Sequence, residues 1–582
     1  MLEVWNFGNT TVRNPNRIEI GLKLFANEFQ GRLTGDDAEI NFANRLIEED
    51  VVSSESEGDK AAWLARKWRS VLTKLGFATN KNYRLGQHRF TPRNLADIKP
   101  ELNLQGFNYE LTPSGNNLLR ADSLAAIHDV YLRQLLAHEV PNPIESNFSD
   151  GMMKPFIFLL QVLHKLHSID EPGLTKIEVS IFIQPFINHT QDAVNNITSS
   201  IIEFRQTRAN LNSHREKREF ENNFLQDRVN QFDRPIQPDT MLAYADTTFR
   251  YSSMTGLVSY NRDRLKLKEE RLDIINNILD TEPNFLAQQS PFEYLLKFYR
   301  GSILPTDDLS FSQREIVRLR EQILQRGEEP RGVLPEDDAE ISELERIRYD
   351  LLEQLGWLDE ANFADDQSSE DAILEIIDYL ERLASGRRNI DIDHPPSYLE
   401  WAVWRGFLAF DHIINPIHET RGFSLDENLL PRNTAPGGRP DMLFEFQDFV
   451  LAVEVTLTSS SRQLVAEGES VRRHVADIKE QINKDIYCLF IAPDIDNNTA
   501  ETFRIGIWYR GDVEDYLNIV PIQITEFINV ISLLQSSPVD PSQLRQLFDR
   551  CLAYRNSKAP QWKRIISETT NSWRLSLIAH QI

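Results

Sequence analysis

The most constraining feature of the sequence is a pair of β-prone runs, 442–446 and 449–456, with only two residues between them. This spacing predicts a tight β-hairpin, because two residues are enough to reverse the chain between antiparallel strands. Asp441 immediately precedes the first run and Glu454 lies within the second. The hairpin would therefore bring these two carboxyl groups close together.

Glu454 is embedded in an apolar run, 451–455, of the kind found in strands that are buried on both faces. Carboxylates are seldom buried without a partner or a metal ion. Asp441 follows Pro440 and the segment 435–439, whose two glycines let backbone approach a ligand closely. Both features favour a functional pair of acids. The alternative is an edge hairpin whose acids are simply solvated.

Asp441, Glu454 and the main-chain carbonyl of Val455 would together form a site made of oxygen atoms. Mg²⁺ prefers oxygen ligands. The hairpin therefore predicts the metal-binding half of a site that hydrolyses phosphodiesters.

The residues after the hairpin add a further acid and a histidine. A polar loop over 457–466 precedes a helix-like run over 467–479. Glu467 and His474 are seven residues apart, or two helical turns, so both would face the hairpin if the helix begins at Glu467. Gly468 weakens that start. The carboxylate is then a candidate metal ligand, and the imidazole could orient or deprotonate a water molecule.

These added groups also have structural alternatives. A surface salt bridge between Glu469 and Arg472 or Arg473 would explain the charges of this helix without any catalytic role. Glu400 lies earlier, in an aromatic amphipathic helix over 397–407, from which it could close the metal site on its other side. The alternative for Glu400 is an exposed acid on a helix whose aromatic side chains belong to the core.

Four motifs in this part of the chain resemble a known family. They are Gly438-Arg-Pro-Asp441, Val453-Glu-Val-Thr456, Glu467 with Arg473-His474, and the strand-like run 485–495. Together they resemble the catalytic domain of the AlwI/PleI family of type IIS restriction endonucleases, which includes strand-specific nicking enzymes. Weaker likenesses over 22–27, 129–135 and 246–257 extend the resemblance over most of the chain.

The resemblance implies a nuclease of the PD-(D/E)XK class that uses Mg²⁺. It implies Glu400, Asp441, Glu454 and Glu467 as the acidic catalytic set, with His474 as an auxiliary group. Asp441, Glu454, Val455 and Glu467 are the expected metal ligands.

This class usually carries a lysine two residues after the second acid, and here that position is Thr456. A threonine supplies no cation to the attacking hydroxide, so another group must replace the lysine. Glu467, His474 and Lys479 are the candidates.

A chain of 582 residues is too long for one core and suggests three to four domains. Its only cysteines, Cys488 and Cys551, exclude a disulfide framework or a cysteine-rich zinc finger and are typical of a reducing cytoplasm. The chain opens with no secretory pattern and has no apolar run near the roughly 18 residues of a membrane span. We therefore expect a soluble cytoplasmic protein without a membrane partner.

A net charge of −25 is unfavourable for binding DNA, but the acidic residues are concentrated in one segment. Residues 328–381 carry 19 acidic and 3 basic side chains, whereas residues 60–93 carry nine basic and no acidic ones. Such a basic segment favours contact with DNA phosphates, the alternative being a solvated basic face. The candidate DNA-binding residues are Lys60, Arg66, Lys67, Arg69, Lys74, Lys81, Arg84, Arg89 and Arg93.

The hydrophobic pattern predicts a helix over 61–75 that ends at Gly76 and is followed by short strands near 83–85 and 109–112. This order resembles a winged helix, and a second such unit ends in a basic, strand-like wing over 262–268. The side chains expected to face inward from the first helix are Trp63, Leu64, Trp68, Val71, Leu72 and Leu75.

The predicted fold is multidomain α/β with four parts. Residues 1–150 and 151–282 form two winged-helix-like DNA-recognition subdomains, 283–390 an acidic helical linker, and 391–582 the PD-(D/E)XK nuclease domain. The acidic linker would repel DNA and hold the two functional ends apart.

The chain is interpreted as a type IIS restriction endonuclease, a strand-specific nicking enzyme, or the large subunit of such an enzyme. It would bind a short asymmetric sequence in double-stranded DNA and cut at a fixed distance outside it. Second-strand cleavage would need a second copy or a separate small nuclease subunit, and a cognate DNA methyltransferase is the expected genetic partner. The alternatives are an inactive nuclease-like DNA-binding protein used for assembly and a structure-specific repair nuclease.

Overall fold

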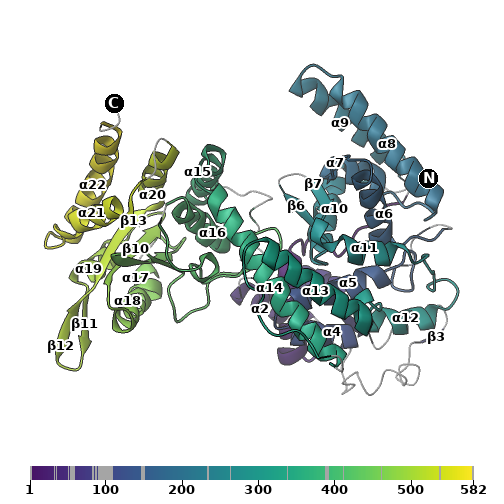
Figure 1. Ribbon diagram of the computed structural model, residues 1–582, viewed down its shortest axis with the longest axis horizontal. Helices are drawn as coiled ribbons and strands as arrows, with labels where there is room; N and C mark the ends of the chain where they lie inside the picture. The colour runs from purple at the N-terminus through teal and green to yellow at the C-terminus, as the bar shows by residue number, and fades with distance from the viewer. Residues whose placement is uncertain are drawn as a thin grey trace. The chain divides into compact units, whose positions relative to one another are not determined.

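A computed structural model gives the fold of the chain as two compact units, Met1–Gln354 and Leu355–Ile582 (Figure 1). The predicted division into four functional parts stays a prediction. The structure describes residues 3–31, 33, 36–49, 51–52, 59–80, 84–85, 88–89, 109–145, 148, 151–232, 235–261, 264–336, 339–386, 392, 394–410, 412–459, 462–535 and 539–579.

The first unit is mainly helical and contains small antiparallel sheets. Its helices are α1 (Ile18–Lys23), α2 (Asp36–Glu48), α3 (Asp59–Lys74), α4 (Pro113–Arg120), α5 (Leu124–Ala137), α6 (Pro155–His167), α7 (Lys176–Glu178), α8 (Gln191–Ala209), α9 (His214–Val229), α10 (Pro238–Ser253), α11 (Leu272–Leu279), α12 (Pro291–Arg300) and α13 (Leu309–Gln325). Its strands are β1 (Ala78–Asn80), β2 (Arg84–Leu85), β3 (His88–Arg89), β4 (Tyr109–Leu111), β5 (Leu174–Thr175), β6 (Val258–Asn261) and β7 (Arg264–Leu267). Helix α14 (Ile341–Asp366) runs through the boundary between the two units.

The helix predicted over 61–75 is present as α3, and Gly76 ends it with a positive φ of 73°. A left-handed residue at a helix end favours glycine because it has no Cβ. The predicted inward side chains are buried except for Trp63, which is 47% exposed, so the prediction for that residue was wrong. The Trp63 ring lies on the outer face, with the Lys67 ammonium 5.3 Å from its centroid.

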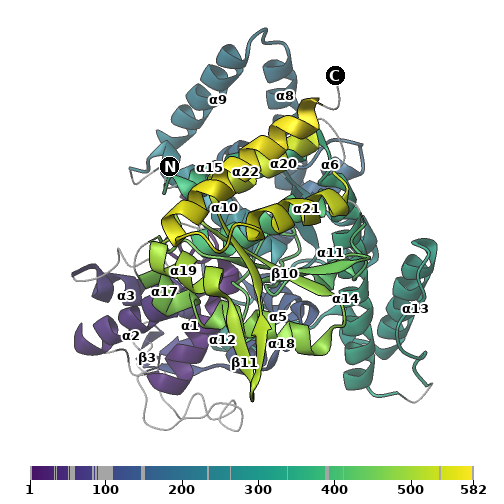
Figure 2. The same ribbon diagram turned by 90° about the vertical axis from the view of Figure 1, so that its left-hand side faces the viewer.

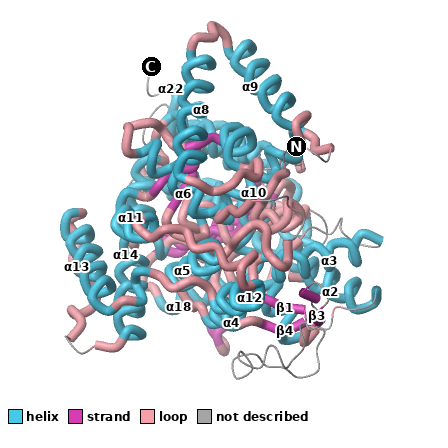
Figure 3. Tube along the Cα trace, turned by 90° about the vertical axis from the view of Figure 1, so that its right-hand side faces the viewer, coloured by secondary structure: helices cyan, strands magenta, loops and turns pink. Residues whose placement is uncertain are grey.

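The segment 151–282 contains a three-stranded antiparallel sheet in the order β5–β7–β6. Helix α6 precedes β5, and α10 precedes the hairpin β6–β7. Thr175 caps α7 with a reciprocal capping box to Glu178. Helices α8 and α9 lie side by side as a helical hairpin between α7 and α10 (Figure 3).

The first unit is held together by one large hydrophobic core that extends along the sequence from Trp5 to Leu304. Trp5 near the N-terminus is 1% exposed, and its indole N–H donates to the carbonyl of Ile183 at 3.0 Å. Long-range contacts of this kind join the segments before and after residue 150 in a single core.

The second unit is built on a four-stranded sheet in the order β13–β10–β9–β8; β10 and β13 are labelled in Figure 1. Strands β8 and β9 are antiparallel, while β10 is parallel to both β9 and β13. The strands are β8 (Met442–Glu445), β9 (Phe449–Val455), β10 (Asp485–Ala492), β11 (Ile507–Arg510), β12 (Val513–Tyr516) and β13 (Asn518–Gln523), with β11 and β12 forming a separate hairpin. The helices are α15 (Glu370–Ala384), α16 (Pro395–Leu408), α17 (Arg462–Glu467), α18 (Ser470–Gln481), α19 (Asn497–Ile505), α20 (Ile524–Ile531), α21 (Pro541–Leu552) and α22 (Ala559–Ala579).

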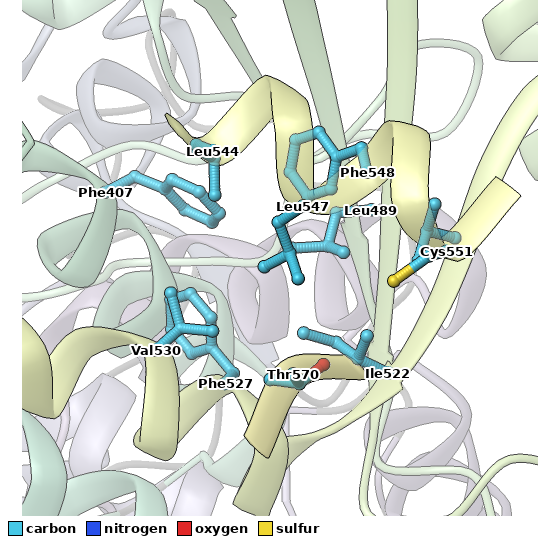
Figure 4. A pocket seen from close by; sticks show the side chains of 11 residues that line it. Phe407, Leu489, Ile522, Phe527, Val530, Leu544, Leu547, Phe548, Cys551 and Thr570 are labelled. Carbon is cyan, nitrogen blue, oxygen red and sulfur yellow. The ribbon is translucent and has the colours of Figure 1, made fainter. Parts of the chain in front are cut away.

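The two faces of this sheet have different neighbours. Leu489 pairs with Val453 and Val520, so these side chains share one face, and Phe490 pairs with Glu454 on the opposite face. Helices α20, α21 and α22 cover the first face and enclose a small apolar cavity against it (Figures 2 and 4). The cavity is lined by Phe407, Leu489, Val520, Ile522, Phe527, Val530, Leu544, Leu547, Phe548, Cys551 and Thr570. That face is packed core, which leaves the Glu454 face for a site.

None of the helices in the described part of the chain is both long enough and apolar enough to cross a membrane.

Candidate active site

The predicted hairpin is present and joins the two acids. Strands β8 and β9 pair in antiparallel register with Met442 opposite Val453. This register places Asp441, the residue before β8, next to the end of β9. The backbone N–H of Val455 donates to Oδ2 of Asp441 at 2.8 Å. Asp441 is therefore fixed to the strand that carries Glu454.

Glu454 is buried, with 6% of its surface exposed, as its apolar surroundings indicated. It lies on a strand paired on both sides, with β8 and β10 as neighbours. Nδ1 of His474, on α18, lies 2.7 Å from Oε1 of Glu454. The acid of the sheet and the histidine of the following helix therefore form a buried hydrogen-bonded pair.

Glu400 is not an exposed acid. It lies on α16 with 5% of its surface exposed, and its Oε2 accepts the backbone N–H of Ala435 at 2.7 Å. Trp401 and Trp404 on the same helix belong to the hydrophobic core, as expected. The helix thus anchors itself through its aromatic residues and directs one carboxylate toward the segment before Asp441.

The predicted helix boundary after the hairpin was wrong. Helix begins at Arg462 rather than at Glu467, and α17 ends at Glu467 before α18 starts at Ser470. Glu467 and His474 therefore lie on two short helices separated by an elbow. Glu467 still faces the hairpin, because Thr456 donates a side-chain hydrogen bond to it. The alternative surface pair also exists, since Arg473 and Glu469 are 3.4 Å apart.

These acids repel one another electrostatically. Burial, together with Asp441 and Glu454, raises the pKa of Glu400 well above its usual value. Burial and Glu454 do the same to the pKa of Asp441, and burial and Glu467 raise the pKa of Glu454 to about 8. Burial also raises the pKa of Glu467 and lowers that of His474. Because these carboxyl groups cannot all be ionised at once without a compensating positive charge, the cluster is suited to a bound cation.

The cluster offers carboxylate oxygens, which are the kind of ligand that Mg²⁺ prefers. Within the described residues, Oδ2 of Asp441 accepts the N–H of Val455, Oε1 of Glu454 pairs with His474, and the Glu454 carboxylate also accepts a backbone hydrogen bond from Asp441. Nε2 of His474 is buried without a hydrogen-bond partner there. No group of three or more His, Cys, Asp or Glu side chains in the described residues is arranged to hold a metal unaided. Mg²⁺ is usually held by one or two carboxylates, water and substrate phosphate.

Thr456 occupies the position where this nuclease class usually has a lysine, and three groups were predicted to replace it. Two of them, Glu467 and His474, lie at the acid cluster. The third, Lys479, points elsewhere, because its ammonium donates to the Asp515 carboxylate and to the carbonyl of Tyr516 at 2.9 Å. A positive charge acts on Glu454 from Arg473 instead. It opposes part of the rise in the pKa of Glu454 that burial causes.

The basic segment divides into exposed and firmly held side chains. Arg66 is 52% exposed and lies 3.7 Å from the Glu39 carboxylate, and Lys67 contacts the Trp63 ring. Arg69 donates to Leu33 and Glu39, whereas Lys74 donates to Asn6 and pairs with Glu145 at 2.8 Å. Lys60 lies in α3, Arg84 in β2 and Arg89 in β3, with their side chains outside the described set, and Lys81 and Arg93 lie outside the described residues altogether.

Sequence reasoning missed Gln463. Its side chain is fully buried in α17, within the segment predicted to be a polar loop. A glutamine in a polar stretch carries no pattern that distinguishes it from solvated neighbours, so no local signal could have identified it.

The chain matches the sequence profile of the family described as AlwI restriction endonuclease over residues 73–530. No curated protein matches it.

Three solved structures are similar to parts or most of the chain. The small subunit of the heterodimeric restriction endonuclease R.BspD6I is 24% identical, with 36% of this chain and 99% of that one covered and a TM-score of 0.27. The BpuJ1 endonuclease binding domain, solved with pyrene- and phenanthrene-modified DNA, is 16% identical, with 51% and 98% covered and a TM-score of 0.29. Restriction endonuclease FokI is 11% identical, with 94% and 99% covered and a TM-score of 0.25.

The profile match spans well over half of the 582 residues and includes Asp441, Glu454, Glu467 and His474. The chain therefore belongs to the AlwI restriction endonuclease family.

Proposed function

We propose that this protein is a type IIS restriction endonuclease that binds a short asymmetric sequence in double-stranded DNA and hydrolyses a phosphodiester at a fixed distance outside it, using Mg²⁺. The proposal rests on one observation above all. Four carboxyl groups that are far apart in sequence, from Glu400 to Glu467, converge on one another and on His474 in a chain of this family.

In this proposal Asp441, Glu454 and the carbonyl of Val455 hold the metal ion, and Glu467 completes or tunes the site. The bound ion would neutralise the cluster, polarise the scissile phosphate and lower the pKa of a bound water. Glu400 supports the site from α16 by fixing the backbone at Ala435, close to Asp441. The site would belong to the PD-(D/E)XK class, with Thr456 in place of the usual lysine.

His474 would accept the proton of the attacking water. Its lowered pKa keeps the imidazole neutral. When Nδ1–H donates to Glu454, the lone pair is left on the buried Nε2, which can accept a proton. Glu454 would thus orient the histidine as well as bind the metal.

DNA recognition would belong to the segments 1–150 and 151–282, separated from the nuclease segment 391–582 by the acidic helical linker 283–390. The order α6, β5, α7, then α10, β6 and β7 after the inserted helical hairpin α8–α9, with β7 central in the sheet, supports a winged-helix assignment for the second segment. Basic residues of 60–93 would contact phosphates.

One acidic cluster provides chemistry for one phosphodiester at a time. A monomer should therefore nick DNA, and a second copy or a small nuclease subunit should be needed to cut the other strand. A cognate DNA methyltransferase would protect the host sequence. In a plasmid time course with Mg²⁺, nicked circles should appear first, and linear DNA should rise steeply with protein concentration if the partner is another copy.

Mapping the ends of those products tests the function. Ends at one fixed distance from a common short sequence are expected. No cleavage of any duplex with Mg²⁺ would favour an inactive DNA-binding assembly protein. Ends that follow DNA structure rather than sequence would favour a repair nuclease.

A further inference from the structure

Helix α17 carries Glu467 but has almost no apolar anchor. It spans six residues, and the only one buried is Gln463. Val465, its most apolar side chain in hydropathy, is 86% exposed. Since helices this short are unstable alone and are normally held by buried apolar faces, α17 needs another source of order.

Gln463 provides that order through its amide. Its Nε2 donates to the carbonyl of Thr458 at 2.7 Å and to that of Asp494 at 3.0 Å, and its Oε1 accepts the backbone N–H of Asp496 at 2.9 Å. The side chain is 0% exposed. One buried amide therefore joins the segment after β9, helix α17 and the segment after β10. Removing it would leave two carbonyls and one N–H without these part-buried hydrogen bonds.

Two of the joined segments, the one after β9 and helix α17, are linked to the acid cluster by hydrogen bonds and by the chain itself. The backbone N–H of Thr458 donates to Oγ1 of Thr456 at 3.1 Å, and Thr456 donates in turn to Glu467. Gln463 and Glu467 are also four residues apart on α17, so they share its inward face. The position of Glu467 is thus fixed both through the helix and through Thr456.

The C-terminal end of α17 is equally constrained. The N–H of Gly468 donates to the carbonyl of Leu464 at 3.0 Å, and a Cβ added at Gly468 would lie 2.6 Å from that oxygen. No side chain fits there, so the elbow between α17 and α18 is tightly packed. A shift of α17 would be passed on to both Glu467 and His474.

We propose that Gln463 is a positioning residue of the cleavage site, which sets the place of Glu467 and Thr456 without touching DNA or metal. This inference rests on the proposed nuclease function. Its role goes beyond stability, because two of the segments it joins are helix α17, which carries Glu467, and the segment that follows Thr456.

The test compares Gln463→Met with a matched control, Gln367→Met. Gln367 is also a buried glutamine of the second unit, 2% exposed, with its amide bonded to the carbonyl of Phe363 and to Arg405, each at 2.7 Å. Gln463→Met loses three amide hydrogen bonds and Gln367→Met loses two, one of them to the Arg405 guanidinium, so both melting temperatures should fall. For each variant, kcat for plasmid nicking, Kd for the cognate duplex and amide hydrogen exchange are measured.

For Gln463→Met we expect kcat to fall on the order of 10- to 100-fold with Kd unchanged, since small displacements at a reacting centre have effects of this size. Faster hydrogen exchange should be confined to Thr458, Asp496 and α17. Gln367→Met should retain wild-type kcat. Exchange in these segments equal to wild type, or kcat equal to that of the control, would overturn the positioning role. Faster exchange in a protein whose wild type cleaves no duplex would refute the nuclease function and leave only the structural link.

Discussion

Asp129 in the first unit and Glu454 in the second are both carboxyl groups on buried secondary structure, 4% and 6% exposed, yet their surroundings are opposite. Asp129 on α5 pairs with the buried guanidinium of Arg348 and accepts the hydroxyl of Tyr349 at 3.1 Å. Burial alone would raise its pKa, but Arg348, together with Arg271 and Arg133, outweighs burial and lowers it. Glu454 faces other acids, and its pKa is raised to about 8.

The difference separates a structural charge from a functional one. In the first unit a buried acid is compensated within the protein, and the pair joins segments that are 219 residues apart in sequence. In the second unit the acids lack enough positive charge from the protein. Such an arrangement weakens the fold unless something from outside completes it, which is why strongly perturbed carboxyl groups are frequent at functional sites.

The largest expected effect is on cleavage. Asp441→Ala should lower Mg²⁺-dependent nicking on the order of a thousandfold or more, because it removes a proposed ligand from a preorganised site. Duplex affinity should stay close to wild type in a gel-shift titration, since binding is proposed for another part of the chain. The matched control is Glu445→Ala at the other end of β8, where the acid only pairs with Lys484 at 2.8 Å. Nicking by Asp441→Ala at the control's rate would refute the site.

The next effect is on stability in the first unit. Asp129→Ala should lower the free energy of unfolding by about 3–5 kcal/mol, because Arg348 would be left buried without its carboxylate. Calorimetric scans measure this loss, and the nicking rate well below the transition should stay near wild type. A loss below about 1 kcal/mol would place Asp129 among ordinary surface acids.

A smaller effect of opposite sign is expected in the second unit. Without divalent cations, Glu400→Gln should raise the free energy of unfolding by about 1 kcal/mol, because it removes one of several buried acids that disfavour one another's ionisation. The amide oxygen of the glutamine can still accept the N–H of Ala435. The same calorimetric scan detects it. A fall in melting temperature would mean that positive charges of the protein already compensate these acids, as Arg348 compensates Asp129.

The smallest effect extends the comparison to surface cations. Replacing Arg66 and Lys67 with Gln should reduce the log–log salt slope of duplex binding by about 0.9 for each lost phosphate contact. Arg69→Gln is the contrasting variant, because Arg69 is held by Leu33 and Glu39 and should affect melting temperature instead. A slope unchanged by the double replacement would assign Arg66 and Lys67 to a solvated face.

Local patterns were sufficient for the hairpin, for the burial of Glu454 and for the core role of the α16 tryptophans. Each depends on alternation or amphipathicity within a few residues. They could not show that Trp63 faces outward, because α3 has more apolar residues than its buried face can take. They also missed the start of α17, where one buried glutamine replaces an apolar face, and the pairing of Asp129 with Arg348, which only tertiary contact creates.

The central claim is that the acid cluster of the second unit is completed by a cation. It is tested most directly by the melting temperature of the wild type, Glu445→Ala and Asp441→Asn over a series of Mg²⁺ concentrations. A ligand that binds only the folded state stabilises it by an amount that grows with the logarithm of its concentration once that concentration exceeds Kd. The account predicts a rise that grows with Mg²⁺ for the wild type and Glu445→Ala, and little or none for Asp441→Asn. An equal rise in all three proteins, or no rise in the wild type, would contradict it.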